Sequence, residues 1–392
     1  MKATIRLASC LMVVLYCSCG HGTTSSVVKD MDSLIVISPA DYVEHSFKLS
    51  DFADSIAFIE LAPDIPFEGG VRQICPDGLI VYNHFKEYMF LSREGKFLHS
   101  IGKIGNAPDE YRQNNRGIIY GWIDCFYDHR RDCHVIYSTI PSRRGLRLKY
   151  YDKNGEYYGS VLLNHPYPHL VPHSEHVFFS EGYYYMALFS TYLKEDIAVI
   201  CFDSIGNSVL EIPNDKHRTL AASNNVMRNQ YRDHHLIWGY NDTIYEVRGA
   251  QCTSSYVWDI DEAVRVKIEH DHFPDELEEH QFAPWVIHDS KEWLFIGCWN
   301  ENFYCYNKSE HKLYGNKPLV NDLGHYSLDI FFDGYYYDEA NDEEWLYATF
   351  YHGERLLELL EETDDLRSMA MRKVLSKKDD INPILVMVRL KK

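Results

Sequence analysis

Short runs of alternating apolar and polar residues recur along the chain, and pairs of these runs are separated by a polar turn. In the clearest pair, Tyr88–Ser92 and Lys96–Ile101 flank Arg93-Glu94-Gly95. The pattern is typical of an antiparallel hairpin, because alternation places every second side chain on one face of a sheet and glycine suits a tight turn. Similar units recur at Leu148–Leu163, Val199–Ile212, Asp242–Ile260 and Asn302–Leu319, and a last one begins at Glu344–Phe350.

The spacing of these units indicates the architecture. Their turns lie near residues 95, 155, 206, 249, 310 and 353, so the repeat length is about 50 residues, which is typical of a four-stranded propeller blade. We therefore predict an all-β fold, a six-bladed β-propeller that forms a single domain over residues 34–392.

Two strands without a hairpin partner lie near the ends of the domain. Ser55–Leu61 reads SIAFIEL, and Ile384–Leu390 reads ILVMVRL. A ring of blades closes when strands from its two ends pair with each other. Without that pairing, the end blades would keep open sheet edges, which invite aggregation. We therefore expect the N-terminal strand to close the last blade. Residues 354–378 have apolar positions at helical spacing, which predicts a short helical insertion in that blade.

The N-terminus resembles a lipoprotein-type secretory signal. Lys2 and Arg6 precede a short apolar run, and Ser18 stands directly before Cys19. The run is shorter than the ~20 residues that span a bilayer. The resemblance implies a signal peptide over residues 1–18 and lipid attachment at Cys19, followed by a flexible spacer over residues 19–33. We expect a cell-envelope protein anchored in the outer membrane, and the lack of an acidic cluster after Cys19 favours a periplasm-facing position.

Net charge bears on the possible partners, and the cysteine pattern bears on possible disulfides. The formal net charge of −19 argues against nucleic acid as a partner, because phosphates would be repelled. Seven cysteines remain after Cys19, and none forms a CxxC pair. Cys125 with Cys133, and Cys298 with Cys305, could form disulfides, or all seven could be buried thiols.

Several of these segments together resemble a known family. The run FLSREGKFLHSIGKIGNAPDEY, the DTIY at 242–245, the early LSDFADSIAFIEL and the final INPILVMVRL are similar to lipid-anchored six-bladed β-propellers of gut Gram-negative anaerobes. That family is related in fold to TolB-like and NHL-type propellers. The resemblance covers about residues 45–390. It implies the fold and an envelope location but no activity, since propellers host both binders and enzymes.

Candidate ligand-binding residues come from a linker and from strand aromatics. Glu110 and Tyr111 lie in a linker that should approach one mouth of the central channel. They could contact a ligand there, or they could only fix the loop. Tyr184 and Trp238 could stack on a sugar or a peptide, or pack between blades. The acidic run 338–344 lacks calcium-loop spacing because position 340 is alanine, so we interpret it as a solvated turn.

Histidine clusters suggest a metal ion as the one possible cofactor. His165, His169, His173 and His176 fall within twelve residues, and His270 and His272 alternate so that both could face one side of a strand. Solvated loops explain both clusters without a metal, and the sequence predicts no other cofactor.

The sequence supports three functional hypotheses. The first is a lipid-anchored cell-envelope propeller that binds an envelope protein or a glycan or peptide ligand, with membrane contact through the lipid alone. The second is a propeller enzyme, a hydrolase or lyase acting on glycans or peptides. The third is a scaffold that docks a partner through the 354–378 insertion. No GxSxG, HExxH, Walker or GxGxxG motif is present, so no catalytic residue is assigned.

Overall fold

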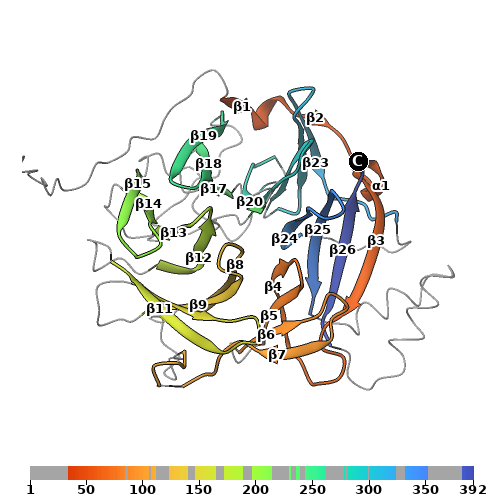
Figure 1. Ribbon diagram of the computed structural model, residues 1–392. Coiled ribbons are helices and arrows are strands. Elements are labelled where there is room, and N and C mark those ends of the chain that lie inside the picture. The colour runs from red at the N-terminus through yellow and green to blue at the C-terminus, as the bar shows by residue number, and fades with distance from the viewer. Residues whose placement is uncertain are drawn as a thin grey trace, which may run out of the picture.

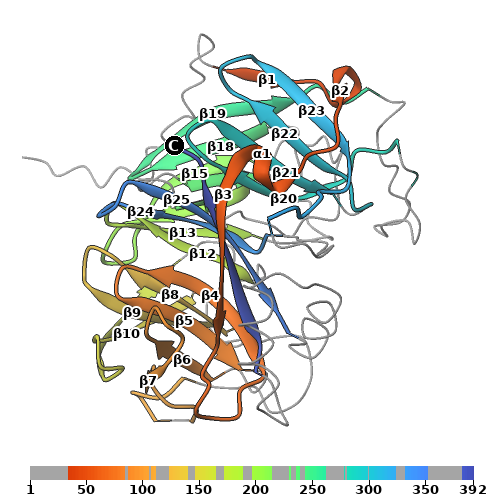
Figure 2. The same cartoon turned by 90° about the vertical axis from the view of Figure 1, so that its right-hand side faces the viewer.

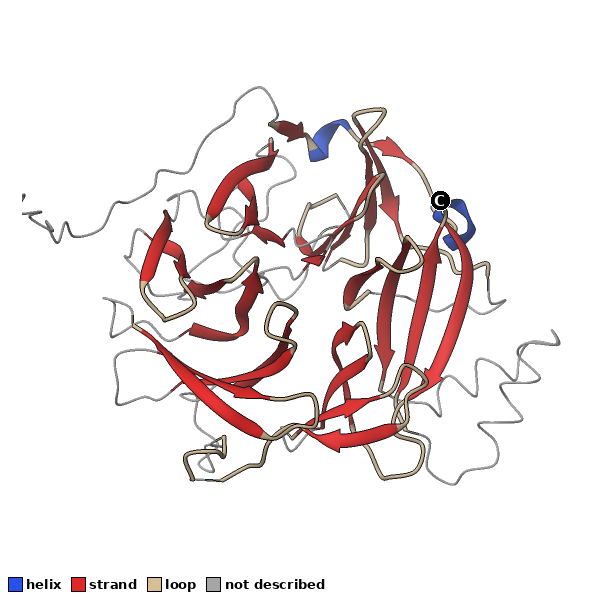
Figure 3. Ribbon diagram, viewed as in Figure 1, coloured by secondary structure: helices blue, strands red, loops and turns tan. Residues whose placement is uncertain are grey.

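The computed structural model shows six sheets arranged as blades in a ring (Figure 1). It describes residues 34–83, 87–105, 107–111, 123–139, 146–164, 172–188, 197–213, 229–230, 235–238, 243–261, 278, 280–298, 300–323, 332–351 and 382–392. Strands form nearly all of the regular structure in these residues (Figure 3). The chain is therefore an all-β, six-bladed β-propeller, as the hairpin repeat predicts.

Blades 1 to 3 each consist of four consecutive antiparallel strands, numbered here from the centre of the ring outward. Blade 1 contains β4 (Gly69–Cys75), β5 (Gly78–Asn83), β6 (Tyr88–Leu91) and β7 (Phe97–Ser100). Blade 2 contains β8 (Ile123–Asp128), β9 (Cys133–Thr139), β10 (Leu146–Tyr151) and β11 (Tyr157–Leu163). Blade 3 contains β12 (Pro172–Ser180), β13 (Tyr183–Leu188), β14 (Ile197–Phe202) and β15 (Ser208–Pro213).

Blades 4 to 6 each receive an additional outer strand from the N-terminal part of the chain. Blade 4 contains β17 (His235–Trp238), β18 (Thr243–Arg248), β19 (Gln251–Trp258) and then β1 (Ile35–Ile37). Blade 5 contains β20 (Pro284–Asp289), β21 (Trp293–Cys298), β22 (Phe303–Asn307), β23 (Lys312–Lys317) and then β2 (Val43–Glu44). Blade 6 contains β24 (Gly334–Asp338), β25 (Glu343–Phe350), β26 (Ile384–Leu390) and then β3 (Ala53–Glu60), with β16 (Asn229–Gln230) parallel to β24.

Residues 35–60, which we call the rim strap, run around the outside of three consecutive blades (Figures 1 and 2). β1 pairs in parallel with β19, and β2 pairs in parallel with β23. The 3-10 helix η1 (Pro39–Asp41) and the helix α1 (Leu49–Phe52) connect these strands to each other and to β3. The sequence did not predict β1 or β2, because strands of two or three residues carry no measurable alternation.

β3 closes the ring by pairing antiparallel with β26, with Ala57 opposite Met387 and Ile56 opposite Val388. This confirms the predicted pairing of the N-terminal and C-terminal strands. The ladder joins the first described segment to the last one, so the two ends of the domain stabilise each other.

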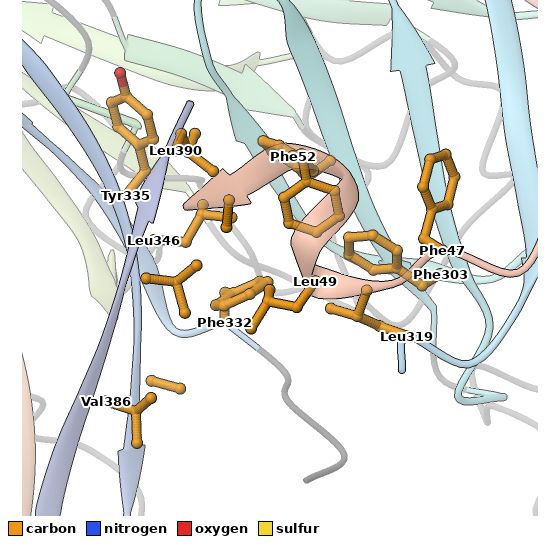
Figure 4. Close-up of a cluster of buried hydrophobic side chains, with 14 of the residues drawn as sticks. Phe47, Leu49, Phe52, Phe303, Leu319, Phe332, Tyr335, Leu346, Val386 and Leu390 are labelled. Atoms are coloured by element: carbon orange, nitrogen blue, oxygen red, sulfur yellow. The ribbon is translucent and has the colours of Figure 1, made fainter. Parts of the chain in front are cut away.

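The helix α1 anchors the rim strap between blades 5 and 6 (Figure 4). Leu49 is fully buried and Phe52 is 4% exposed, in a cluster that includes Phe303 of blade 5 and Leu346 of blade 6. The ring centroids of Phe52 and Phe303 are 6.1 Å apart. Burial of a large apolar side chain contributes about 1.5–3 kcal/mol, so these two residues hold the strap on the ring.

The hairpin glycines also join neighbouring blades. Gly95, Gly155 and Gly206 have φ of +83°, +81° and +91°, a conformation that favours glycine. Their carbonyl oxygens accept backbone N–H bonds from residues 62, 102 and 164, each just past the outer strand of the preceding blade, at 2.8, 3.0 and 3.1 Å. The turn signal in the sequence is therefore also an inter-blade contact.

Two further expectations concern helices. The predicted helical insertion at 354–378 lies outside the described residues. Within the described ranges, no helix is long and apolar enough to cross a bilayer.

The seven cysteines from Cys75 to Cys305 are buried and free. The buried-thiol interpretation therefore holds, and the disulfides Cys125–Cys133 and Cys298–Cys305 do not form. Neither pair is directly opposite in its ladder, since Cys125 faces Ile136 and Cys305 faces Phe295.

Candidate functional site

A cleft of about 1060 Å³ lies where blade 6 meets blade 1. It opens beside the turns that join the first and second strands of blades 1, 2 and 6. Its lining consists of Ala57, Ile59, Pro76, Asp77, Arg93, His129, Phe179, Tyr336, Tyr337, Asp338, Glu339, Ala340, Asn341, Trp345 and Met387. The cleft therefore exists only because the ring closes at this junction.

The apolar part of the cleft comes from the closing strands. Ala57 and Ile59 alternate on β3, so both side chains point to the same sheet face. Met387 lies directly opposite Ala57, and Trp345 of β25 lies opposite Arg389. Ala57, Ile59, Met387 and Trp345 line the cleft. The closing ladder thus presents an apolar surface with a partly exposed indole.

Arg93 and Tyr336 connect the two walls of the cleft. The Arg93 Nε and Nη2 atoms each donate to the carbonyl oxygen of Pro76 at 3.1 Å, and Nη2 also donates to the Tyr336 hydroxyl. The guanidinium carbon lies 4.5 Å from the centroid of the Tyr336 ring. Burial raises the pKa of Tyr336, and nearby Arg93 lowers it by a smaller amount, so the hydroxyl is neutral near pH 7.

Three carboxylates stand at the edge of the cleft, and they differ in their partners. Asp338 accepts hydrogen bonds from the Ala340 N–H at 3.1 Å and from the Asn341 amide at 3.0 Å. Asp77 of blade 1 and Glu339 of blade 6 are exposed and make no hydrogen bond or ion pair with the described residues. Two carboxylates on opposite walls are therefore available to a ligand.

The inner end of the cleft reaches toward blades 2 and 3. His129 follows β8, and its ring meets Tyr127 edge-on at a centroid distance of 4.9 Å. Phe179 of β12 is 7% exposed. The cleft therefore combines apolar, aromatic, cationic and anionic groups, which is the usual composition of a binding site.

The predicted linker residues Glu110 and Tyr111 mainly hold their own loop. Glu110 Oε2 accepts the Ala107 N–H at 2.8 Å. The Tyr111 hydroxyl accepts the Tyr88 N–H at 3.2 Å, and Tyr111 is 2% exposed. Tyr111 does contribute to a second pocket of about 510 Å³ between blades 1 and 2, together with exposed Asp109. A ligand role for Glu110 and Tyr111 stays a prediction.

Tyr184 is fully buried between blades 2 and 3. Its hydroxyl donates to Asp128 Oδ2 at 2.9 Å and accepts from the Tyr150 hydroxyl at 3.1 Å. Desolvation raises the pKa of Asp128, and the Arg131 backbone N–H and charge partly oppose this shift. The structure thus accounts for Tyr184 as an inter-blade contact.

The other candidate residues have no described side-chain environment. Trp238, His173 and His176 lie in strands for which only the backbone is described. Cys19, His165, His169, His270 and His272 lie outside the described residues. In the part of the chain that the structure describes, no three His, Cys, Asp or Glu side chains are close enough together to hold a metal ion. The histidine metal sites and lipid attachment at Cys19 stay predictions.

The cleft itself was not predicted from the sequence. The acidic run 338–344 was interpreted as a solvated turn. Only the closure of the ring brings this run beside Arg93 and Asp77. The available signal was indirect: the predicted closing pair implied that the first and last blades meet.

The chain belongs to a family defined as a domain of unknown function, DUF4934, whose model matches residues 34–389. No curated protein is significantly similar to it in sequence. Among solved structures, it is similar to BamB from Moraxella catarrhalis, with 11% identity, a TM-score of 0.35, and coverage of 69% of this chain and 66% of BamB. It is also similar to a chain of a nidogen/laminin complex, with 13% identity, a TM-score of 0.34, and coverage of 65% and 78%.

Proposed function

We propose that this protein is a lipid-anchored propeller of the cell envelope that binds a partner protein in the cleft between blades 6 and 1. The cleft carries the proposal, because it is large and its composition matches a protein-binding surface. Its volume of about 1060 Å³ is slightly above the ~300–1,000 Å³ typical of small-molecule sites, so it has room for a protein segment.

The chemistry of the cleft fits an interface. Protein-binding surfaces combine an apolar centre with a polar rim, and they are enriched in Trp, Tyr, Met and Arg. The cleft has Trp345, Met387 and Tyr336 among its lining residues, and Asp77 and Glu339 at its edge. Burial of the partly exposed Trp345 indole against a partner would supply a hydrophobic part of the binding energy.

The membrane part of the proposal rests on the sequence of residues 1–33. A lipid on Cys19 would leave a spacer of residues 20–33 before the rim strap begins, with a reach of roughly 45 Å when fully extended. The propeller would then remain near the membrane while its cleft meets an envelope protein.

Metabolic palmitate labelling tests the lipid anchor. Cys19→Ala should abolish this labelling, whereas Cys17→Ala should preserve it. Labelling that persists in Cys19→Ala would contradict the anchor.

Site-specific photo-cross-linking tests the binding function. A benzophenone amino acid at Asn341, which is exposed and lines the cleft, should give a discrete adduct in intact cells. The same amino acid at Lys153, exposed on the hairpin turn of blade 2, is the matched control and should give none. The adduct at position 341 should disappear when Ala340→Trp obstructs the cleft. A cross-link pattern that is the same at both positions would contradict binding at the cleft.

A further inference from the structure

We infer that His99 of blade 1 and His134 of blade 2 together bind one transition-metal ion beside the second pocket. The ion belongs to the class that imidazole ligands favour, such as Zn²⁺, Cu²⁺ or Ni²⁺. This site is separate from the partner-binding cleft between blades 6 and 1. The inference comes from the spacing of the two rings, from their buried nitrogens and from the charge of the neighbouring pocket.

The two imidazole rings meet across the junction of blades 1 and 2. His99 lies on β7 and His134 on β9, and their ring centroids are 5.9 Å apart. Because metal–nitrogen bonds are ~2.0–2.1 Å long, two imidazoles on one ion place their ring centres roughly 5–6 Å apart. The observed spacing therefore fits two ligands of a single ion.

Each ring has a buried nitrogen that lacks a hydrogen-bond partner in the described part of the chain. These atoms are Nε2 of His99 and Nδ1 of His134, and His134 as a whole is 1% exposed. The Nε2 edge of His99 points toward blade 2, because its Cδ2 atom would lie 3.0 Å from a Cβ at Gly155. Buried polar atoms are rarely left without a partner, so the two nitrogens indicate a bound species between the blades.

Both rings are in the protonation state that binds metal. Burial lowers the pKa of His99, and it lowers the pKa of His134 to about 4, with His99 adding to the second shift. The Asp152 carboxylate opposes the pKa shift in both rings, so a negative charge lies near the pair. Neutral imidazole is the metal-binding form, and it predominates in both residues at pH 7.

The second pocket gives an ion access to this pair. His99 lines the pocket, whose volume is about 510 Å³. Its described lining also includes three carboxylates and one ammonium group, from Glu87, Asp109, Glu156 and Lys103, and an excess of negative charge concentrates cations. The described residues supply no third His, Cys, Asp or Glu ligand, so water from the pocket completes the coordination.

Calorimetric titration of the full-length chain tests the inference. The chain in detergent is stripped with EDTA, dialysed, and titrated with ZnCl₂, NiCl₂ or CuSO₄ alone. We expect at least one of these metals to bind at this site with one ion per chain. His99→Ala and His134→Phe should each weaken that binding at least ten-fold.

Two control variants locate the ion. His280→Gln replaces an exposed histidine and should bind metal like the parent chain. His169→Ala with His173→Ala removes part of the histidine cluster predicted from the sequence, and it should also leave the binding unchanged. Binding that is lost in the His169 and His173 variant but unchanged in His99→Ala would overturn the inference.

Spectroscopy keeps the test independent of whether the His99 and His134 variants fold. Electron spin echo modulation of the Cu²⁺ complex of the His169→Ala, His173→Ala chain should show two coordinated imidazoles. One imidazole or none, or the absence of metal binding in the parent chain, would show that the two nitrogens do not share an ion. Either result would overturn the inference and leave the proposed partner-binding function untouched.

Discussion

The guanidinium of Arg93 in blade 1 lies over the ring of Tyr336 in blade 6, 4.5 Å from its centroid. The two residues are 243 positions apart in the sequence, and ring closure brings them together. The contact connects the two walls of the cleft and so joins the first blade to the last. Binding surface and closure are therefore built from the same side chains.

Replacing Arg93 should destabilise this junction. Arg93→Met removes a cation–π contact, worth about 0.5–2 kcal/mol, and hydrogen bonds from a charged donor, worth ~1.5–3 kcal/mol. We expect the free energy of unfolding in urea to fall by about 2 kcal/mol. Lys96→Met, an exposed position on the same turn, is the control. Equal stability of the two variants would show that the Arg93 contact contributes nothing.

The turn glycine of blade 2 should be essential for packing against blade 1. Gly155 has φ +81°, and a Cβ there would overlap the carbonyl oxygen of Ser100 in β7. Gly155→Ala should therefore cost about 2–3 kcal/mol from strain and displaced packing. Gly159→Ala is the control, because its Cβ would lie 3.8 Å from Tyr150. Thermal unfolding that is unchanged in Gly155→Ala would contradict the inter-blade contact.

The rim strap should depend on Leu49. Leu49→Ala empties a fully buried site beside Phe52 and Leu346, so we expect a loss of about 2–5 kcal/mol in chemical unfolding. Val43→Ala, at a strap residue that is 46% exposed, should change stability by less than about 0.5 kcal/mol. If both variants unfold at the same urea concentration as the parent chain, α1 does not anchor the strap.

Buried histidines should make the fold sensitive to acid. Burial lowers the pKa of His134 to about 4 and that of His288 to about 4, from an ordinary value of 6.5. Between these values the unfolded chain binds protons that the folded chain does not, so stability falls as pH falls.

Each of these histidines should lower the free energy of unfolding by about 3 kcal/mol as the pH falls from 6.5 to 4. His134→Phe should make the plot of unfolding free energy against pH flatter below pH 6.5. His280→Gln, at an exposed histidine whose side chain is 58% accessible, should leave the slope unchanged. A slope that is the same in His134→Phe as in the parent chain would refute the assignment.

The sequence predicted the fold well because its signals are local. Alternation and the turn glycines define hairpins within about 15 residues, and the unpartnered Ser55–Leu61 and Ile384–Leu390 indicated closure. β1 and β2 were missed because their position depends on the edges of blades 4 and 5, which are formed by residues more than 200 positions away. Local patterns carry no information about such contacts.

The candidate site could not be predicted for a related reason. Asp77 and Glu339 are ordinary turn residues in the sequence, and only the closed ring brings them to the edge of one cleft. The sequence left two roles open for Tyr184, stacking on a ligand or packing between blades, and the structure buries it with Asp128 and Tyr150. Pairing and burial are three-dimensional properties, and they decide which polar groups remain free.

Cysteine accessibility tests the central claim, occupation of the cleft by a partner, most directly. The seven cysteines among the described residues are buried, so Ala340→Cys adds an exposed thiol at the cleft, and Lys153→Cys adds one at a distant exposed position. Maleimide labelling rates should match in the purified chain. In the native envelope, we predict that labelling at position 340 slows at least ten-fold while position 153 is unaffected. Equal labelling at both positions in the envelope would contradict the account.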